Sequence, residues 1–374
     1  MYAGGDADDG RTAFRRAEKR YKLHREQTFR RRKGRLKSAG FSTRAVDLSD
    51  VLDLAHLRAR EATDPAVRRV DVDVGDAARP DVVETYRLES HPGLVLVPGA
   101  LTIPEQRRWL RAAVTDLCEP PARTNHAAAH GAFPNLWTQA CRPDARALDQ
   151  PAPYTPASAV NDPDPAALRG RGWVTLDPPP PAGDPRSNVL ASSLLRRLRW
   201  ATLGAPYDWT ARKYLHDAPH HLPPDDLRAA CRRLAAAAGV DNFAADAGLV
   251  NYYRSGDALA GHVDDAEANL DRPIVSLSLG CPAVFLLGGA TRDEEPVAVL
   301  LRSGDAAVLT GETRRWFHGV PRIFAGEEGV VDAFGQPLRA PREVSDPEVW
   351  TEEPKLAEYV AGGRVNISLR DGVG

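Results

Sequence analysis

A histidine and an aspartate two residues apart have the types and spacing of a metal site. They are His262 and Asp264, in the segment Gly261-His262-Val263-Asp264-Asp265. On a β-strand, residues i and i+2 project from the same face, so both side chains can reach one ion. A second histidine, His318, follows 54 residues after Asp264. A His-x-Asp pair alone also occurs by chance, but two histidines and one carboxylate leave coordination positions open, which is diagnostic of non-haem Fe(II) oxygenases.

A second polar group lies near the end of the chain. In the segment from Arg364 to Arg370, polar and apolar residues alternate. A strand there would place four polar side chains on one face, namely Arg364, Asn366, Ser368 and Arg370. Such a face is costly inside a barrel unless a ligand satisfies it. Oxygenases of this kind usually need an organic acid, whose far carboxylate requires a fixed cation. The alternative is an exposed edge strand with its polar face in water.

Short apolar runs in the second half of the chain are the elements that would position these groups. They recur at close spacing and are separated by turn residues such as Gly288-Gly289 and Ser303-Gly304-Asp305. This pattern is typical of an antiparallel sandwich or jelly roll. The predicted strands are Leu249–Tyr253, Ile274–Leu279, Ala283–Leu287, Val297–Leu301, Ala306–Leu309 and Val365–Leu369.

Two helices are predicted before these strands. Thr102-Ile103-Pro104-Glu105 has the Ser/Thr-x-x-Glu pattern of a helix start, and the helix should extend to about Leu117. A second helix should run from Pro224 to Ala238, with Gly239 just past its end. The order of elements therefore predicts an α+β fold, with a sandwich or jelly roll behind a helical N-terminal half.

Basic residues gather near the N-terminus, although the whole chain is almost neutral. There are 49 Lys and Arg against 51 Asp and Glu, but residues 11–37 hold thirteen basic residues and only two acids. Their composition predicts a helix. It could be a nuclear-import patch, a phosphate-binding arm or a solvated helix with no partner. Acidic residues before it, such as Asp8 and Asp9, argue against a mitochondrial presequence.

Composition argues against several classes of protein. No run of 18 apolar residues is present, so we expect no membrane-spanning segment, and we expect no secretion signal at the N-terminus. The four cysteines are far apart, without a Cys-x-x-Cys pair. We therefore expect neither a zinc ribbon nor a disulfide framework. The cysteines are Cys118, Cys141, Cys231 and Cys281.

Six motifs follow one another in the second half of the chain. They are Asn251-Tyr252-Tyr253-Arg254, His262-Val263-Asp264, Pro273 to Gly280, Ser303-Gly304-Asp305, His318, and Arg364-Val365-Asn366 followed by Arg370. In order and spacing they resemble the AlkB family of Fe(II)- and 2-oxoglutarate-dependent nucleic-acid dioxygenases. The resemblance covers roughly residues 190–374 and is closest to the first AlkB homologue of animals.

Further segments are similar to that branch of the family. Its substrate lid is matched by Leu194 to Gly204, Tyr207-Asp208-Trp209 and Lys213-Tyr214. Its N-terminal extension is matched by Ala13-Phe14-Arg15-Arg16 and by Ala45 to Asp50, and two more matches are Phe285 to Gly289 and Arg292-Asp293-Glu294.

The resemblance implies a fold and a domain organisation. The fold would be a double-stranded β-helix (jelly-roll) dioxygenase core with a helical N-terminal extension and a nucleotide-recognition lid. Residues 1–85 would form the basic helical extension and a linker, with a short helix near Leu48–Arg60. Residues 86–374 would form the dioxygenase domain. Within it we expect a substrate lid at about 120–220, which includes a long surface loop from Cys141 to Arg186, and a catalytic jelly roll at about 245–374.

The resemblance also implies roles for the site residues. His262, Asp264 and His318 would bind Fe(II) and form the catalytic centre. Arg364 would pair with the distal carboxylate of 2-oxoglutarate. Four further residues would complete the co-substrate pocket: Asn251, Tyr253, Asn366 and Arg370. With O2, these cofactors would oxidise an N-methyl group on a base, releasing formaldehyde, succinate and CO2.

Two features depart from the bacterial prototype. Ala266 stands where the prototype has an acidic residue that helps to recognise a cationic methylated base, which argues against alkylation repair. Arg364 follows His318 by 46 residues, farther than in the prototype, because a polar insertion extends from Ile323 to Gly363. An insertion there is also seen in the animal first homologue.

An enzyme that oxidises a methyl group on a base must take that base out of the stack or act where it is unpaired. Aromatic and cationic residues just before the predicted strands could provide stacking and phosphate contacts. Those expected to contact nucleic acid are Trp200, Tyr207, Arg212, Lys213 and Tyr214. Trp200 and the nearby Trp209 could equally be core residues. We interpret His216, His220 and His221 as a surface loop.

The main hypothesis is an oxidative demethylase of N-methylated nucleobases. Its substrate would be methyladenine in tRNA or N6-methyladenine in unpaired or bulged DNA, and the sequence does not decide between them. A protein (histone) hydroxylase or demethylase on the same scaffold is one alternative. A catalytically retired nucleic-acid-binding protein is another. We expect a monomer in the nucleus, with the mitochondrion or cytoplasm as alternative locations.

Overall fold

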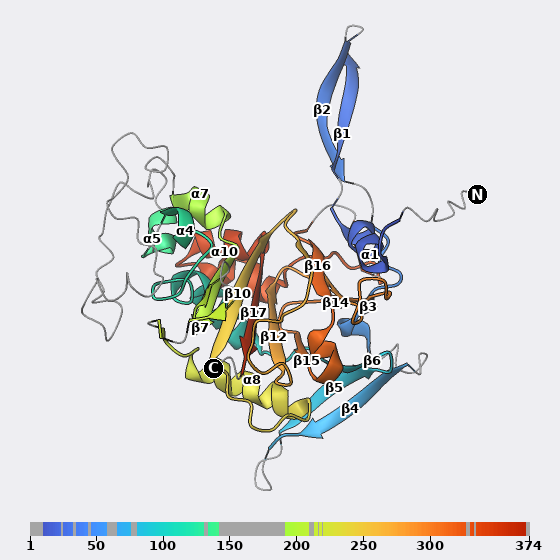
Figure 1. The fold of residues 1–374 in the computed structure, drawn as a ribbon. Helices are drawn as coiled ribbons and strands as arrows, with labels where there is room; N and C mark the ends of the chain where they lie inside the picture. The colour runs from blue at the N-terminus through green and yellow to red at the C-terminus, as the bar shows by residue number, and fades with distance from the viewer. Residues whose placement is uncertain are drawn as a thin grey trace.

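Two sheets form the centre of the molecule, with antiparallel pairing throughout except for the parallel pair β14–β3 (Figure 1). The computed structural model describes residues 10–23, 25–32, 35–43, 46–57, 66–75, 81–130, 134–141, 191–208, 213–215, 217–218, 220–326, 330–332 and 334–371.

The helices are α1 (Ala13–Tyr21), α3 (Ile103–Thr115), α4 (Ala127–His130), α5 (Leu136–Ala140), α7 (Ala191–Arg196), α8 (Asp225–Ala237), α9 (Arg342–Ser345) and α10 (Pro354–Ala361), with 3-10 turns η1 (Leu54–His56), η4 (Gly311–Arg315) and η5 (Pro347–Trp350). The strands are β1 (Arg25–Arg32), β2 (Arg35–Thr43), β3 (Leu52–Asp53), β4 (Val67–Asp73), β5 (Val82–Leu88), β6 (His91–Val97), β7 (Trp200–Gly204), β8 (Tyr207–Asp208), β9 (Lys213–Tyr214), β10 (Ala247–Arg254), β11 (Leu259–His262), β12 (Ile274–Gly280), β13 (Ala283–Leu287), β14 (Val297–Leu301), β15 (Ala306–Leu309), β16 (His318–Ile323) and β17 (Gly363–Arg370).

The larger sheet has eight strands in the order β4-β5-β6-β15-β12-β17-β10-β7, and the smaller has five in the order β11-β16-β13-β14-β3. Apolar side chains of β6, β12 and β15 pack against those of β13 and β14, so the inner faces of the two sheets form one core layer. This arrangement is the jelly-roll core that the sequence predicts, and the α+β class is confirmed.

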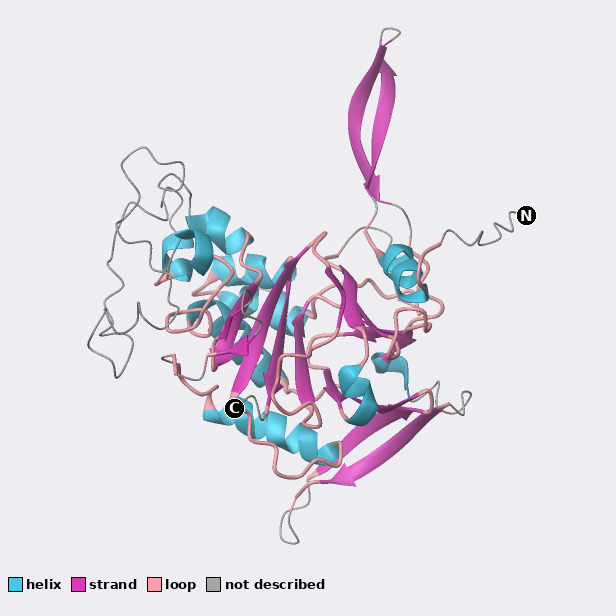
Figure 2. Cartoon of the chain, in the orientation of Figure 1, coloured by secondary structure: helices cyan, strands magenta, loops and turns pink. Residues whose placement is uncertain are grey.

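Helices α3, α8 and α10 cover the outer face of the larger sheet (Figure 2). Their apolar stripes pack on the outward-facing residues of the central strands. On β17 these are Val365, Ile367 and Leu369, each at most 1% exposed. The central strands of this sheet are therefore buried on both faces, and the polar residues that alternate with these three on β17 point toward the other sheet.

Local sequence signals account for six strands of the two sheets and for helices α3 and α8. Each predicted strand is confirmed, as are both predicted helices. Helix α3 begins with the expected capping box, because the Thr102 side chain accepts from the Glu105 backbone and the Glu105 carboxylate accepts from the Thr102 backbone. Helix α8 ends before Gly239, whose φ of +85° favours glycine.

The helix expected over residues 11–37 is confirmed only in its first part. Helix α1 ends at Tyr21, and β1 and β2 then form a separate antiparallel hairpin in which Arg32 pairs with Arg35. Arginine and lysine favour helices, which explains the wrong prediction. Cross-strand pairing and the β-prone residues Thr28, Phe29 and Phe41 favour the hairpin instead.

The linker expected up to residue 85 is also wrong in part. Strand β4 pairs with β5 along its whole length, and both belong to the eight-stranded sheet. The boundary expected between residues 85 and 86 thus falls inside β5. In β4 the run Val-Arg-Arg-Val-Asp-Val-Asp brings apolar residues to partly alternating positions, a strand signal that its charged residues obscured.

Two other predicted segments have different outcomes. The surface loop expected from Cys141 to Arg186 lies almost entirely outside the described residues. The polar insertion between Ile323 and Gly363 contains α9, η5 and α10, and buried Leu356 and Val360 of α10 join the core beneath the larger sheet.

Replacing Gly204 by alanine tests the close approach of β7 to the chain before β10. Gly204 has a φ of +66°, and a Cβ there would overlap the backbone oxygen of Asp246. Gly239→Ala is the matched control, because φ is also positive but no atom lies within 4 Å of the new Cβ. We expect Gly239→Ala to lower the free energy of unfolding in urea by about 1–2 kcal/mol. Gly204→Ala should cost about 1–3 kcal/mol more from overpacking; equal losses would contradict the close approach.

Candidate active site

The structure brings the three predicted metal ligands together from two neighbouring strands. His262 is the last residue of β11 and His318 is the first residue of β16, and the two are direct partners in the antiparallel pairing. Asp264 follows β11 by two residues. Ligand atoms of the three side chains all lie within 4.8 Å of one another.

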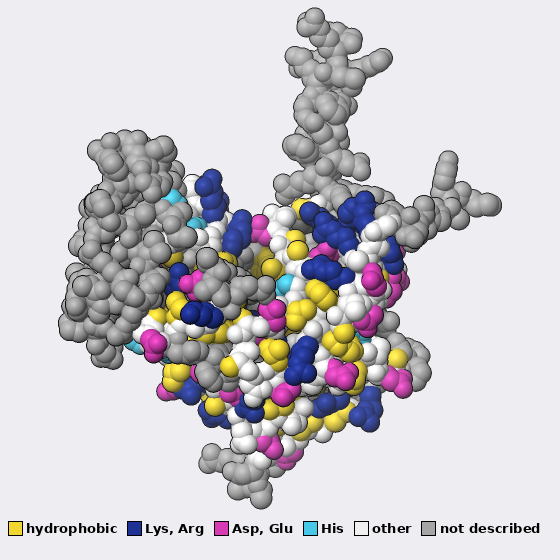
Figure 3. Space-filling model, viewed as in Figure 1, with side chains coloured by type: hydrophobic (Ala, Val, Ile, Leu, Met, Phe, Trp, Pro, Cys, Tyr) yellow, Lys and Arg dark blue, Asp and Glu magenta, His cyan; other side chains and the backbone are white. Residues whose placement is uncertain are grey.

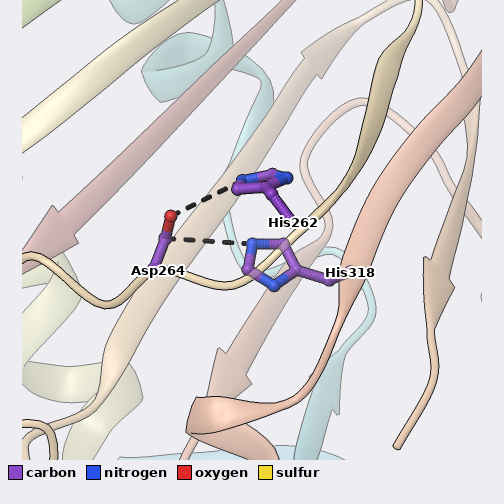
Figure 4. Close-up of side chains that lie close together, drawn as sticks. All are labelled: His262, Asp264 and His318. Atoms are coloured by element: carbon purple, nitrogen blue, oxygen red, sulfur yellow. Dashed lines mark ion pairs between the residues drawn. The ribbon is translucent and has the colours of Figure 1, made fainter. Parts of the chain in front are cut away.

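The side chains converge on one point (Figure 4). The Nε2 atom of His262 is 3.5 Å from Oδ1 of Asp264, and Nε2 of His318 is 3.8 Å from Oδ2. The two imidazole ring centroids are 4.4 Å apart. One face of the cluster opens into a cavity that all three residues line.

Backbone carbonyls fix the orientation of both imidazoles. The Nδ1 atom of His262 lies 3.0 Å from the oxygen of Ala260, and Nδ1 of His318 lies 3.2 Å from the oxygen of Trp316. Because a carbonyl can only accept, each Nδ1 must carry the proton. In the neutral form of each imidazole, Nε2 is then the nitrogen that carries the lone pair, as in a metal ligand.

The surroundings shift the pKa values of the three groups in different directions. Burial lowers the pKa of His318 to about 4, so its imidazole is neutral at neutral pH. Burial alone would lower the pKa of His262 as well, but the hydrogen bond and the charge of Asp264 outweigh burial, so the pKa of His262 is raised above its ordinary value. Burial would raise the pKa of Asp264, yet Arg370 and the two histidines hold it well below its ordinary value. The carboxylate is therefore ionised.

A buried network of alternating charges holds the Asp264 carboxylate. Arg370 donates to Oδ2 of Asp264 at 2.6 Å, and its Nε lies 2.7 Å from a Glu267 oxygen. Glu267 also pairs with Arg314 at 2.7 Å, and Arg314 donates to the backbone oxygen of Asp264 at 2.6 Å. The Oδ1 atom of Asp264 is left to face His262.

Strand β17 supplies the polar face predicted from its alternation. Its four polar residues, Arg364, Asn366, Ser368 and Arg370, all line the cavity. Cross-strand partners on both sides extend this face, because Asn366 lies opposite Asn251 of β10 and Ser278 of β12, and Arg364 lies opposite Tyr253.

Arg364 is a buried cation with only neutral partners. It is 2% exposed and donates to the Ser278 hydroxyl at 2.8 Å and to the Cys281 carbonyl at 3.4 Å. Its Nε has no partner, and among the described residues no carboxylate forms an ion pair with it. Burial lowers the pKa of Arg364 to about 10, so the guanidinium is still charged at neutral pH. A buried charge of this kind calls for an anionic ligand.

Two predicted pocket residues, Tyr253 and Asn366, present polar groups at the cavity wall. Tyr253 is 6% exposed, and burial raises its pKa to about 12, so the phenol remains protonated. Asn366 donates to the Ser276 hydroxyl at 2.7 Å and to the Leu277 carbonyl at 2.9 Å. The Asn366 side-chain oxygen is thereby oriented by neighbouring β12.

The cavity between the two sheets has a volume of about 550 Å³. That is within the usual range for small-molecule sites, about 300–1,000 Å³, and leaves room for a small dicarboxylate and a second molecule.

On the face seen in Figure 3, lysine and arginine side chains gather around α1 and beside α7. Basic residues there include Arg15, Lys19 and Arg20 of α1 and Arg196 and Arg197 at the end of α7.

The residues expected to contact nucleic acid are divided by the structure. Tyr207 and Tyr214 line the cavity and form an edge-to-face pair with ring centroids 5.2 Å apart. The Tyr214 hydroxyl donates to Glu267 at 3.1 Å. Trp200, half-buried at the start of β7, and exposed Lys213 do not line the cavity. Arg212 lies outside the described residues, as does Trp209.

Sequence reasoning missed four residues of this site: Glu267, Arg314, Ser276 and Ser278. The two serines had a signal, since they alternate with apolar residues along Ile274-Val275-Ser276-Leu277-Ser278 and so share a face. Glu267 and Arg314 had none, because each is identified only by a partner far away in the sequence.

A second group of possible metal ligands, Asp53, His56 and Asp332, lies elsewhere in the molecule. Arg302 donates to both carboxylates, at 2.6 and 2.9 Å. Because the guanidinium already pairs with both carboxylates, we interpret this group as a structural ion-pair network. Of the histidines expected in a surface loop, His220 and His221 are in a loop and His216 is outside the described residues.

The donor set fits a divalent metal beside a dicarboxylate. The site offers two imidazoles, which bind metals through Nε2 when neutral, and one ionised carboxylate. This set suits a first-row metal with open coordination positions. Arg364, on the polar face of the same cavity, offers the cation that a carboxylate group requires.

Comparison with known proteins agrees with this chemistry. Residues 178–370 match the family model described as 2OG-Fe(II) oxygenase superfamily. The chain is 36% identical over 380 residues to DNA N(6)-methyladenine demethylase ALKBH1A of Arabidopsis thaliana, and this match covers 99% of both proteins. It is 30% identical to nucleic acid dioxygenase ALKBH1 of Mus musculus, over 87% of this chain and 79% of that protein.

A shorter match is to tRNA demethylase abh1 of Schizosaccharomyces pombe, 38% identical over 34% of this chain and 43% of that protein. The full-length matches extend the resemblance beyond the jelly roll to the N-terminal segment. The chain therefore belongs to the 2OG-Fe(II) oxygenase superfamily and, within it, to the AlkB family, on the branch of the first AlkB homologue.

Proposed function

We propose that this chain is an Fe(II)- and 2-oxoglutarate-dependent demethylase of N-methylated nucleobases. The observation that carries the proposal is the joining of three features in one cavity: the His262–Asp264–His318 cluster, the unpaired cation Arg364 and the Tyr207–Tyr214 pair. Relatives named as a DNA N6-methyladenine demethylase and a tRNA demethylase support a methyladenine in either nucleic acid as the substrate.

Fe(II) would be held by His262, Asp264 and His318, whose ligand atoms all lie within 4.8 Å of one another. Fe(II), 2-oxoglutarate and O2 together supply the oxidation of an N-methyl group, with succinate, CO2 and formaldehyde as products. The part played by Arg370 is to hold Oδ2 of Asp264, so that the carboxylate keeps one orientation. A ligand fixed in this way loses little freedom when the metal binds.

2-Oxoglutarate would lie along the polar face of β17. Arg364 would pair with its distal carboxylate, and Asn251, Tyr253, Asn366 and Arg370 would line the rest of its site. Ser278 orients the Arg364 guanidinium from the neighbouring strand. Because this end of the cavity is buried, the ion pair would form away from competing water.

The methylated base would lie against Tyr207 and Tyr214. Ala266 packs against this aromatic pair, where the bacterial prototype has an acidic residue. The neighbouring acid, Glu267, already pairs with two arginines. Without an acidic residue at position 266, the wall lacks the attraction that would favour a cationic base over a neutral one such as N6-methyladenine. The basic residues of β1 and β2 remain a predicted phosphate-binding arm.

Removing a metal ligand tests the proposed chemistry. We expect His262→Ala and Asp264→Ala to lower succinate and formaldehyde formation at least about 100-fold, because a direct ligand is lost rather than an outer partner. His56→Ala is the matched control, since His56 belongs to the second His/Asp group away from the cavity. It should keep the activity of the unaltered protein.

The substrates for that assay should be methylated tRNA, methylated single-stranded, bulged and duplex DNA, and methylated histone peptides, with products read by mass spectrometry. Formaldehyde release from peptides but from none of the nucleic acids would favour the protein demethylase. Absence of turnover on every substrate would favour a retired scaffold. Either result would overturn the proposal.

Replacing Arg364 by methionine tests the co-substrate site through stability. Without ligand, Arg364→Met should raise the free energy of unfolding by about 1 kcal/mol or more, because a buried charge without a counter-ion is removed. With Mn(II) present, 2-oxoglutarate at 100 times its Kd should stabilise the unaltered protein by about 2.7 kcal/mol. This gain should be absent in Arg364→Met. The control, Arg322→Met, removes a fully buried arginine of β16 that does not line the cavity, and should keep the gain.

Replacing Tyr207 by alanine tests the stacking wall. Loss of one base–aromatic contact, worth about 1–3 kcal/mol, should raise KM for a methylated oligonucleotide about 5- to 150-fold. KM for 2-oxoglutarate should not change. Trp200→Phe is the control, because Trp200 belongs to the same region but does not line the cavity. Tyr214 is less suitable, since its hydroxyl also contacts Glu267. An unchanged oligonucleotide KM in Tyr207→Ala would argue against stacking at this position.

A further inference from the structure

Helix α1 packs directly on the strands that carry the two metal-site histidines. Figure 1 shows α1 beside β16. Phe14 of α1 is fully buried, in a cluster with Val284 and Leu286 of β13 and with Phe317. The chain folds back so that this N-terminal helix lies behind the metal site, on the side away from β17.

One peptide segment before His262 is held from both sides. The Glu18 carboxylate of α1 accepts the backbone N–H of Gly261 at 2.6 Å. Arg292, in the loop after β13, donates to the backbone oxygen of Gly261 at 2.7 Å. That oxygen belongs to the peptide group bonded to the nitrogen of His262, so the two side chains together fix the backbone from which His262 projects.

Glu18 is a buried acid, 5% exposed. Burying a carboxylate is costly unless its oxygens are paired. One oxygen takes the Gly261 N–H, and the other takes Arg15 at 2.6 Å. A surface salt bridge between Arg15 and Glu18 alone would not require burial, because such pairs form readily in water. The buried position of Glu18 is therefore explained by its contact with the backbone before His262.

The residue before His318 is held by the same elements. The Phe317 ring lies 6.4 Å from the Phe14 ring, and the Arg292 guanidinium lies 4.6 Å above the Phe317 ring. The backbone of Phe14 also donates to the carbonyl of Arg292 at 2.9 Å. Phe14, Glu18 and Arg292 thus contact the residues immediately before both histidines.

Two glycines make room for this contact. A Cβ at Gly261 or at Gly288 would meet the ring of Phe14. Small residues here allow α1 to approach the strands closely enough for Glu18 to reach the backbone. The space is filled by a residue from the other end of the chain, so the metal-site strands are packed only when α1 is in place.

We infer that Glu18 and Arg292 are positioning residues for the metal site, acting through the Gly261 backbone. The inference rests on the proposed metal-binding role of His262, Asp264 and His318. Neither side chain lines the cavity, so neither touches substrate or cofactor. Their contacts set where the His262 imidazole stands, and a metal site tolerates ligand displacements of only a few tenths of an ångström.

The test is the affinity for Mn(II), a redox-inert substitute for Fe(II), measured by calorimetric titration of the full chain. Glu18→Ala and Arg292→Ala should each raise the Kd for Mn(II) on the order of 10-fold, the low end of the range for groups that orient metal ligands. Glu18→Gln should stay within about 3-fold, because its amide oxygen can still accept the Gly261 N–H.

Because Glu18 and Arg292 carry opposite charges, the test can distinguish positioning from an effect of charge. If charge alone mattered, Glu18→Ala and Glu18→Gln would weaken Mn(II) binding equally, and Arg292→Ala would tighten it, because a cation is removed. Positioning requires both alanine variants to weaken binding. Glu295→Ala is the matched control, since it breaks an exposed ion pair of α1, Arg16–Glu295 at 3.1 Å, without touching Gly261. It should leave the Kd within 2-fold.

Coupling of the reaction gives a second measurement. A displaced His262 should raise the ratio of succinate to formaldehyde in both alanine variants, because co-substrate is consumed without methyl oxidation. Unchanged Kd and unchanged ratio in Arg292→Ala, an exposed residue whose loss should not prevent folding, would overturn the inference even if Glu18→Ala does not fold. Failure of the metal-site proposal is separate: Mn(II) would then not bind the unaltered protein, or would bind His262→Ala equally well.

Discussion

The alternation of side chains along β17 is the constraint on which the rest of the site depends. This strand lies between β10 and β12, with apolar residues toward the covering helices and polar residues toward the cavity. A shift of register by one residue would exchange the two sets, placing cations in the helix-packed core. Pairing of Arg364 with Tyr253 on one side and Gly280 on the other excludes that shift.

Charges from separate parts of the chain then set the orientation of the carboxylate proposed as a metal ligand. Asp264, Arg370, Glu267 and Arg314 form one chain of alternating buried charges. Each ion offsets the desolvation of its neighbours, and removal of any one would leave an unpaired buried charge. Through its hydroxyl, Tyr214 connects this chain to the aromatic wall proposed for the base. The sides of the cavity proposed for the metal and for the base therefore share Glu267.

Local patterns predicted the central strands, because a strand buried on both faces appears in the sequence as a short apolar run bounded by turn residues. Local patterns gave wrong predictions for β1, β2 and β4. There the residue composition favours a helix or a linker, but the backbone pairs with a neighbouring strand. The arginines of residues 25–35 favour a helix by propensity, whereas a hairpin is stabilised by partners across the turn. Strand β4 belongs to the sheet only through β5, and such pairing is not visible in a short window of sequence.

The sequence by itself determined the metal-ligand types, the His-x-Asp spacing and the polar face of β17, since these depend on residue identity and on the two-residue period of a strand. Only the tertiary structure decided that Glu267 and Arg314 secure Asp264 and that Glu18 reaches Gly261 across 243 residues. Only the tertiary structure shows that Trp200 and Lys213 do not line the cavity. The physical reason is that the role of a carboxylate depends on which cation or amide reaches it, and the path of the whole chain determines that partner.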